Sequence, residues 1–159
     1  MQKVTPETID IRIYQKLGRV AVKTLDTVDQ LLLVLPARPT RSHFDQLPQG
    51  ARLQAVYRKH AADATPAFTT RLANKRQTLI VAGTLKADAS AFEQLTLGRK
   101  LVAAATSQKA GCLGICAVGF DVDAQAGIVN NILAAALAAA FRMPTLKAKP
   151  DPDKIRSIR

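Results

Sequence analysis

Few residues in this chain have the types and spacing that chemistry requires. His43 and His60 are its two histidines, and neither has a cysteine or carboxylate at metal-ligand spacing, whereas a zinc site needs about four clustered ligands. The close acidic pairs suit turns or helix caps. These pairs are Asp26 with Asp29, Asp121 with Asp123, and Asp151 with Asp153. Neither a Gly-x-Ser-x-Gly elbow nor a Gly-Lys-Ser/Thr phosphate loop occurs, so the sequence predicts no catalytic centre, metal site or cofactor in this chain.

The two cysteines, Cys112 and Cys116, fall in one apolar run that reads as a strand. On a strand they share a face but lie about 13 Å apart, whereas a disulfide needs Cα atoms within about 7 Å. We therefore expect two free thiols that act as small hydrophobic side chains. Gly111 and Gly114 could belong to a glycine-rich phosphate loop, but close backbone packing is the simpler reason for glycine within a strand.

The net charge of +11, with a pI near 10.2, is the unusual feature of the composition. Between Arg38 and Arg76, eight Lys and Arg residues stand against only Asp45 and Asp63. Such an excess can attract nucleic acid, an anionic surface or an acidic partner, and it equally suits a solvated face. No known binding motif accompanies it. The candidate nucleic-acid contacts are Arg52, Arg58, Lys59, Arg71, Lys75 and Arg76.

Hydrophobic patterning in the first half predicts strands at Ile9–Tyr14 and Val20–Val22, which could form a hairpin. The continuous apolar run Leu31–Leu35 suits a strand covered on both faces. Phe44 and Leu47 could share one short helical turn. A helix is predicted over Ala51–Ala62, although Leu53–Tyr57 also alternates as a strand does.

The second half is more regular. Ala67–Leu72 and Gln77–Leu85 predict a β-hairpin whose second arm is central in the sheet. A helix capped by Asp88 or Ser90 follows, and after the strand Gly111–Val118 comes a long helix over Asp123–Met143. The inner face of the first helix is predicted to hold Ala91, Phe92, Leu95, Leu101 and Val102. The core stripe of the long helix is predicted to hold Ile128, Val129, Ile132, Leu133, Leu137 and Phe141. This order of elements predicts an α/β fold, a mixed sheet sandwiched between helices.

At 159 residues the chain fits one domain, which we place at residues 1–143. Residues 144–159 contain Pro144, Pro150 and Pro152 with five Lys and Arg residues, and are predicted to be a basic linker or tail. The start lacks the apolar run of a secretory signal, and the most apolar stretch, Ile132–Phe141, is short for a bilayer. A cytoplasmic location without a membrane partner is therefore expected.

Four segments follow one another in the second half: the run Gln77–Gly83, the helix through Leu101–Ala104, the strand Cys112–Val118 and the Lys-rich exit Phe141–Pro150. In this order they resemble the N-terminal domain of leucyl (cytosol) aminopeptidases. It implies a macro-domain-like three-layer α/β/α fold without hydrolytic activity of its own. It also implies a C-terminal two-metal peptidase domain, carrying zinc or manganese, as partner within a homo-oligomeric parent. The family's metal-binding segment Asn-Thr-Asp-Ala-Glu-Gly-Arg-Leu does not occur here.

The function implied by the resemblance is that of an accessory domain which serves assembly or regulation of a leucyl aminopeptidase. Two alternatives remain open. The basic residues could bind nucleic acid, as some bacterial members of the family do with DNA. A macro-like fold could also bind a nucleotide or ADP-ribose at the carboxyl edge of its strands, near Gly83 and Gly119.

Overall fold

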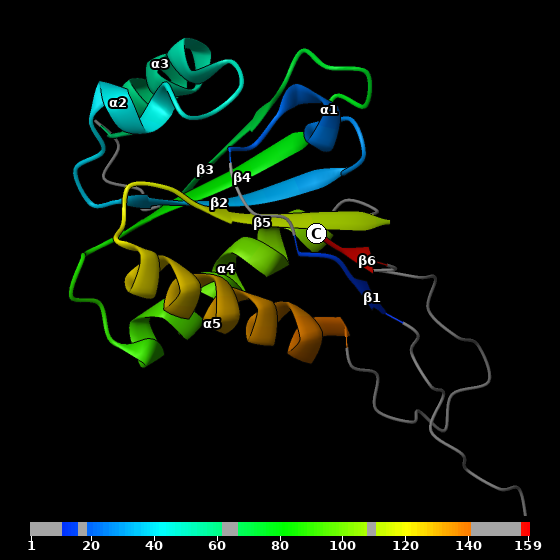
Figure 1. Cartoon of the computed structure of the whole chain (residues 1–159), viewed down its shortest axis with the longest axis vertical. Helices are drawn as coiled ribbons and strands as arrows, with labels where there is room; N and C mark the ends of the chain where they lie inside the picture. The colour runs from blue at the N-terminus through cyan, green and yellow to red at the C-terminus, as the bar shows by residue number, and fades with distance from the viewer. Residues whose placement is uncertain (1–10, 16–18, 62–66, 108–110, 141–156) are drawn as a thin grey trace, which may run out of the picture.

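A six-stranded sheet in the order β1-β6-β5-β2-β4-β3 forms the centre of the computed structural model, which describes residues 11–15, 19–61, 67–107, 111–140 and 157–159 (Figure 1). All neighbouring strands run parallel except β3, which is antiparallel to β4 at one edge. The strands are β1 (Arg12–Ile13), β2 (Gln30–Pro36), β3 (Ala67–Arg71), β4 (Leu79–Leu85), β5 (Cys112–Ala117) and β6 (Ser157–Ile158). The helices are α1 (Val22–Leu25), α2 (Arg41–Phe44), α3 (Gly50–Ala61), α4 (Ala91–Thr106) and α5 (Val122–Ala140).

Helices cover both faces of this sheet, which confirms the predicted mixed α/β architecture. In Figure 1, α4 and α5 lie below the sheet, and α1, α2 and α3 lie above it. Alternate residues of β2 belong to two separate hydrophobic cores. Leu32 and Val34 pack in the core with α4 and α5, while Leu33 and Leu35 pack in the core with α1–α3. Burial on both faces explains the continuous apolar run of this strand.

The predicted hairpin is confirmed. Strand β3 pairs antiparallel with β4, and β4 lies between β3 and β2, inside the sheet as expected. The segment that follows Gly50 is a helix rather than the alternative strand, because Leu53 packs with Phe44 and Phe68 in the upper core while the rest of its surface is largely polar. Phe44 and Leu47 are both buried beside it.

Helix α4 begins at the predicted cap, Ser90, but the first turn of the helix is not buried as predicted. The hydroxyl of Ser90 accepts a hydrogen bond from the Glu93 backbone N–H at 3.3 Å, and the Glu93 carboxylate accepts one from the Ser90 N–H at 2.8 Å. Phe92, expected on the inner face, is 78% exposed. Leu101 and Val102 are buried as predicted, and Leu97 is buried with them although it was not predicted. The prediction was therefore wrong for Phe92 in the first turn and right for the later part of the helix.

The predicted strand at Val20–Val22 is also wrong. Val22–Leu25 forms a single helical turn, closed by the hydrogen bond from the Asp26 N–H to the Val22 carbonyl oxygen at 3.0 Å. Leu25 alone of this turn is buried, and three alternating residues carry too little pattern to distinguish a strand from one turn of helix. Strand β1 therefore pairs with β6 and does not form a hairpin with the next segment.

The end of the chain corrects the predicted tail. Ser157 and Ile158 form β6, which lies in the sheet between β1 and β5, and Ile158 is buried. One buried side chain after a proline-rich segment leaves no periodicity in the sequence. The proposed boundary near residue 143 lies outside the described residues, as does Phe141.

Helix α5 is long and apolar enough, by length and composition alone, to cross a membrane, with a mean hydropathy of 1.3. The prediction that the most apolar stretch is too short to cross a bilayer considered only Ile132–Phe141, and the full length of α5 corrects it. In the structure, Ile128, Ile132 and Ala136 of this helix lie in the core beneath the sheet. That packing is the ordinary state of an amphipathic core helix in a globular domain.

Candidate functional site

A groove of about 1350 Å³ opens where β5 extends beyond its short neighbour β6. Its floor is the carboxyl half of β5, from Gly114 to Ala117. The α1 segment forms one wall and the first half of α5 forms the other, while α2 closes one end through Ser42 and His43. The described part of β6 pairs with Cys112 and Leu113, at the amino end of β5.

Backbone groups of β5 face this groove. The Arg159 N–H donates to the Leu113 carbonyl oxygen at 2.7 Å, and the Ile115 N–H donates to the Arg159 carbonyl oxygen at 2.8 Å. In a parallel ladder, the backbone groups of alternate residues point toward the same neighbouring strand. The Ile115 carbonyl and the Ala117 N–H therefore point to the β6 side of β5. The Ala117 carbonyl oxygen accepts from the Gln125 side chain at 2.7 Å.

The charge of the groove has one sign. Arg19, Lys23 and Arg159 line it, all three of them exposed, and none of its described lining residues is an aspartate or glutamate. Asp121 and Asp26 are adjacent in sequence to lining residues, and their carboxylates accept backbone hydrogen bonds. Asp121 accepts from the Ala124 N–H at the start of α5, and Asp26 accepts from the Lys75 N–H. A cleft lined by cations alone between low-dielectric walls concentrates a positive potential.

Large apolar side chains form part of the rim. Ile13, Tyr14 and Val122 line the groove and are 53%, 49% and 82% exposed. The Arg159 guanidinium lies over the Tyr14 ring, 5.1 Å from its centroid, so a cation–π contact holds these two side chains together at the rim. The groove thus offers apolar contact, backbone hydrogen bonds and positive charge together.

Cys116 lies on the floor of the groove. Burial raises the pKa of its thiol to about 11, so the thiol is protonated at neutral pH and is a poor nucleophile. Both Cys112 and Cys116 are free, as the sequence predicts. The groove therefore has the features of a binding surface, and its thiol is not set up for covalent chemistry.

The two glycines singled out for a ligand edge have different places. Gly119 follows β5 with a φ of +86°, and an added Cβ would lie 2.8 Å from Pro36 and 3.0 Å from His43, so backbone and packing both require glycine there. It lines the groove. Gly83 is buried inside β4, where an added Cβ would lie 2.7 Å from the Leu97 side chain. Its position explains the close packing of α4 on the sheet, and it is not among the described lining residues.

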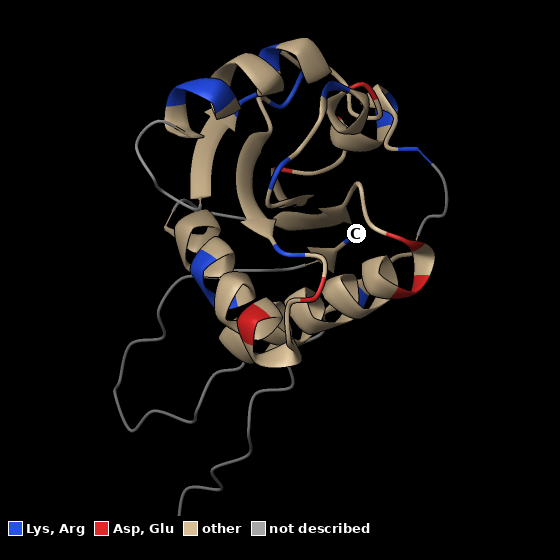
Figure 2. Ribbon diagram, turned by 90° about the vertical axis from the view of Figure 1, so that its left-hand side faces the viewer, with Lys and Arg blue, Asp and Glu red and all other residues tan. Residues whose placement is uncertain are grey.

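Three of the predicted basic contacts share one helix. Arg52, Arg58 and Lys59 are exposed on α3, and Arg52 and Lys59, two turns apart, fall on the same side of it. His60 of the same helix stacks on Phe68, with ring centroids 5.9 Å apart, so this histidine packs on the β3 strand. Figure 2 shows Lys and Arg on several elements and not in one continuous strip.

The other three basic residues belong to the β3–β4 hairpin and are partly engaged there. Arg71 donates to the Gln77 carbonyl oxygen at 3.0 Å. The Arg76 guanidinium pairs with the Asp29 carboxylate at 2.6 Å, which offsets its charge. Lys75 is exposed. The hairpin therefore presents less free positive charge than its sequence suggests.

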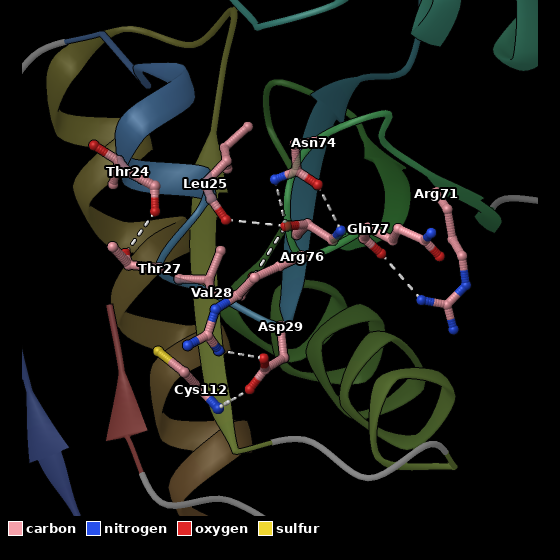
Figure 3. A network of polar contacts seen from close by, with 11 residues as sticks. Thr24, Leu25, Thr27, Val28, Asp29, Arg71, Asn74, Arg76, Gln77 and Cys112 are labelled. Atoms are coloured by element: carbon pink, nitrogen blue, oxygen red, sulfur yellow. Dashed lines mark hydrogen bonds and ion pairs between the residues drawn. The ribbon is translucent and has the colours of Figure 1, made fainter.

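Asp29 is the centre of a polar network at the amino end of the strands (Figure 3). Besides the pair with Arg76, its second carboxylate oxygen accepts from the Cys112 N–H at 2.8 Å. Its own backbone N–H donates to the Cys112 carbonyl oxygen at 2.9 Å, and its carbonyl accepts from the Leu79 N–H at 3.0 Å. One residue thereby ties together the starts of β2, β4 and β5.

Thr78 completes this network from a fully buried position. Its hydroxyl lies 2.9 Å from the Leu25 carbonyl oxygen and 3.0 Å from that of Val28, and it accepts from the Asn74 side-chain amide at 2.9 Å. The Asn74 carbonyl in turn accepts from the Thr78 N–H. These contacts fasten the hairpin turn to the α1–β2 loop, which is a structural role.

Within the described part of the chain, no three His, Cys, Asp or Glu side chains gather so that they could hold a metal ion. His43 is occupied locally, since its Nδ1 accepts from the Thr40 N–H at 3.1 Å. Of the side chains that divalent metals prefer, the described lining of the groove holds His43 and Cys116 and no carboxylate.

Sequence comparison finds no matching family model and no matching curated protein. Among solved structures, the chain is similar in fold to a leucine aminopeptidase mutant from tomato, with a TM-score of 0.66 and 18% sequence identity. The match covers 96% of this chain and 33% of the tomato chain, so this chain spans about a third of that peptidase. At this identity the similarity concerns the fold.

Proposed function

We propose that this chain is a non-catalytic accessory domain, the N-terminal domain of a leucine-aminopeptidase-like metallopeptidase. The observation that carries the proposal is the fold similarity to tomato leucine aminopeptidase, which takes in 96% of this chain but only 33% of the other. A domain that corresponds to one third of a larger enzyme fits an accessory role, in which it supports assembly or regulation of the catalytic part.

In this proposal the chemistry lies in a separate C-terminal domain, which would hold two zinc or manganese ions. The described residues here offer no cluster suited to such ions. The domain would share a macro-like three-layer arrangement, and its parent would be a cytoplasmic homo-oligomer. The partner of this chain would be the peptidase domain of its own polypeptide.

The test begins with the protein as its cells produce it. An antibody raised against this chain should detect a polypeptide about three times heavier than 17.1 kDa, in keeping with the one-third coverage. The immunoprecipitate should hydrolyse leucine p-nitroanilide, lose that activity to a chelator and regain it with zinc or manganese. Precipitation from cells in which the gene is deleted is the control. A 17.1 kDa polypeptide that neither has nor co-precipitates this activity would overturn the proposal.

A second candidate function, nucleic-acid binding, draws support from α3. Arg52 and Lys59 share one side of this exposed helix, with Arg58 on its last turn, and together they could contact successive phosphates. Affinity for a short duplex should then fall steeply with salt, and the R52E/K59E variant should lose it. Absence of binding at low salt would eliminate this function. The nucleotide or ADP-ribose alternative has less support, because Gly83 packs against α4; calorimetry with ADP-ribose tests it directly.

A further inference from the structure

We propose that the two walls of the groove, α1 and the start of α5, form a contact surface for a second copy of this chain, so that two copies associate about a two-fold axis. The proposal goes beyond the accessory role, because it concerns self-association of this chain and holds whether or not a peptidase domain is attached. It rests on three features of the walls: their exposed apolar side chains, their opposite charges, and the single rotation that brings these together.

Each wall presents a large apolar side chain to solvent. Val22 on α1 is 54% exposed, and Val122 at the start of α5 is 82% exposed. Ile13 and Tyr14 at the rim are exposed as well. Three of these four side chains line the groove, and the fourth, Val22, immediately precedes the lining residue Lys23. Exposed apolar side chains that gather on one side of a domain mark a surface that binds a partner.

The residue that follows each valine carries an exposed charge, and the two charges have opposite signs. Lys23 follows Val22 on α1, and Asp123 follows Val122 on α5. Arg19 adds a second exposed cation beside α1. Within the described part of the chain, the side chains of Arg19, Lys23 and Asp123 make no ion pair or hydrogen bond. One side of the domain therefore carries unpaired charges of both signs, which makes it complementary to a second copy of itself.

One rotation brings the complementary walls together. The α1 wall lies above the sheet and the α5 wall below it (Figure 1). A two-fold axis that runs along the groove, between two facing copies, exchanges the walls, so that α1 of each copy meets the start of α5 of the other. Lys23 would then approach Asp123 of the second copy, and Val22 would approach its Val122, twice in the dimer. The contact uses the outer sides of the walls and does not require the floor along β5 to be open.

Sedimentation velocity of the full chain tests the proposal, over a concentration range of about 10–500 µM that suits a contact of few side chains. Wild type should show a monomer–dimer equilibrium. K23E and D123K should each weaken dimerisation about tenfold, because each places like charges at both symmetric contacts. V122S leaves every charge in place and should also weaken dimerisation about tenfold, because an apolar contact is lost twice. The matched controls K100E and D88K make the same charge changes at exposed positions outside the groove, and should alter the dimerisation constant less than about twofold.

A mixture of two variants tests the two-fold arrangement directly. Equimolar K23E and D123K should form a heterodimer about as tightly as wild type, because the acid introduced by K23E meets the base introduced by D123K while the second contact keeps its original pair. Circular dichroism of each variant verifies that it remains folded. The proposal is overturned if wild type stays monomeric throughout the concentration range, or if K100E and D88K weaken dimerisation as much as K23E and D123K. It is also overturned if the mixture of folded K23E and D123K dimerises no better than either variant alone.

Discussion

Replacement of Thr78 by valine tests whether the buried polar network holds the hairpin to the α1–β2 loop. The substitution keeps the shape of the side chain but removes the hydroxyl. That hydroxyl is fully buried and lies within 3.0 Å of the carbonyl oxygens of Leu25 and Val28, and it accepts from Asn74. Loss of a buried hydrogen-bonding group that leaves its partners unsatisfied costs roughly 1–3 kcal/mol.

We therefore expect T78V to lower the free energy of unfolding by about 2 kcal/mol and the melting temperature by about 4–8 °C for a domain of this size. Urea denaturation followed by circular dichroism measures the first, with an unchanged m-value as evidence that the two-state transition is preserved. The control is T69V, the same substitution at an exposed position on β3. If T78V and T69V shift the midpoint by similar amounts, the network does not carry the stability assigned to it.

Four further outcomes concern two residues of the α4 cap, a pair of glycines and one cysteine. Ser90→Ala should cost about 1 kcal/mol of stability in urea denaturation. Hydrogen bonds from Ser90 to the Glu93 carboxylate hold the pKa of Glu93 below its ordinary value of 4.5. The stability that ionised Glu93 contributes is therefore present above pH 4.5 and is lost as the pH falls through the folded pKa. For this reason E93Q and wild type should converge in stability in acid. Gly119→Ala should destabilise the domain by about 1–3 kcal/mol, because Gly119 has a positive φ. Gly127→Ala should stabilise it by roughly 0.5–1 kcal/mol, because the added methyl group meets open space on a helix. Equal shifts of the melting temperature would contradict this. Iodoacetamide should alkylate Cys116 slowly at pH 7, and faster as the pH approaches the raised pKa of this thiol, about 11. Mass spectrometry measures the rate of alkylation. Fast labelling at neutral pH would be inconsistent with the burial of Cys116.

The parts of the fold that the sequence predicted are those with a local pattern. The hairpin of β3 and β4 has two apolar arms and a polar turn, and α5 extends over many turns, so each carries several periods of its signal. Strand β6 and helix α1 are too short for periodicity, and their structure depends on what they contact. Ile158 becomes a core residue only because β1 and β5 flank it.

The groove could not be found from the sequence for a related reason. Its walls come from segments near residues 13–31, 42–46, 114–133 and 158–159, which meet only through the strand order of the sheet. Gly119 is the lining residue that the sequence put forward for a ligand edge, whereas His43, Gly114 and Cys116 were considered and given structural roles. Arg159 was predicted only as part of a basic tail, and Arg19 and Lys23 flank the segment Val20–Val22, which was predicted as a strand.

The density of positive charge along the sequence is a poor guide to where positive charge gathers on the folded chain. The long basic stretch, residues 38–76, contributes its described residues to α2, α3 and the hairpin, and Arg76 there pairs with Asp29. Three cations from remote segments instead converge on one groove whose described lining holds no acid. Charges on an open surface are screened by solvent, whereas a cleft with low-dielectric walls focuses their field. The fold thus divides the +11 charge of this chain among several elements, and a basic stretch of sequence does not become one basic surface.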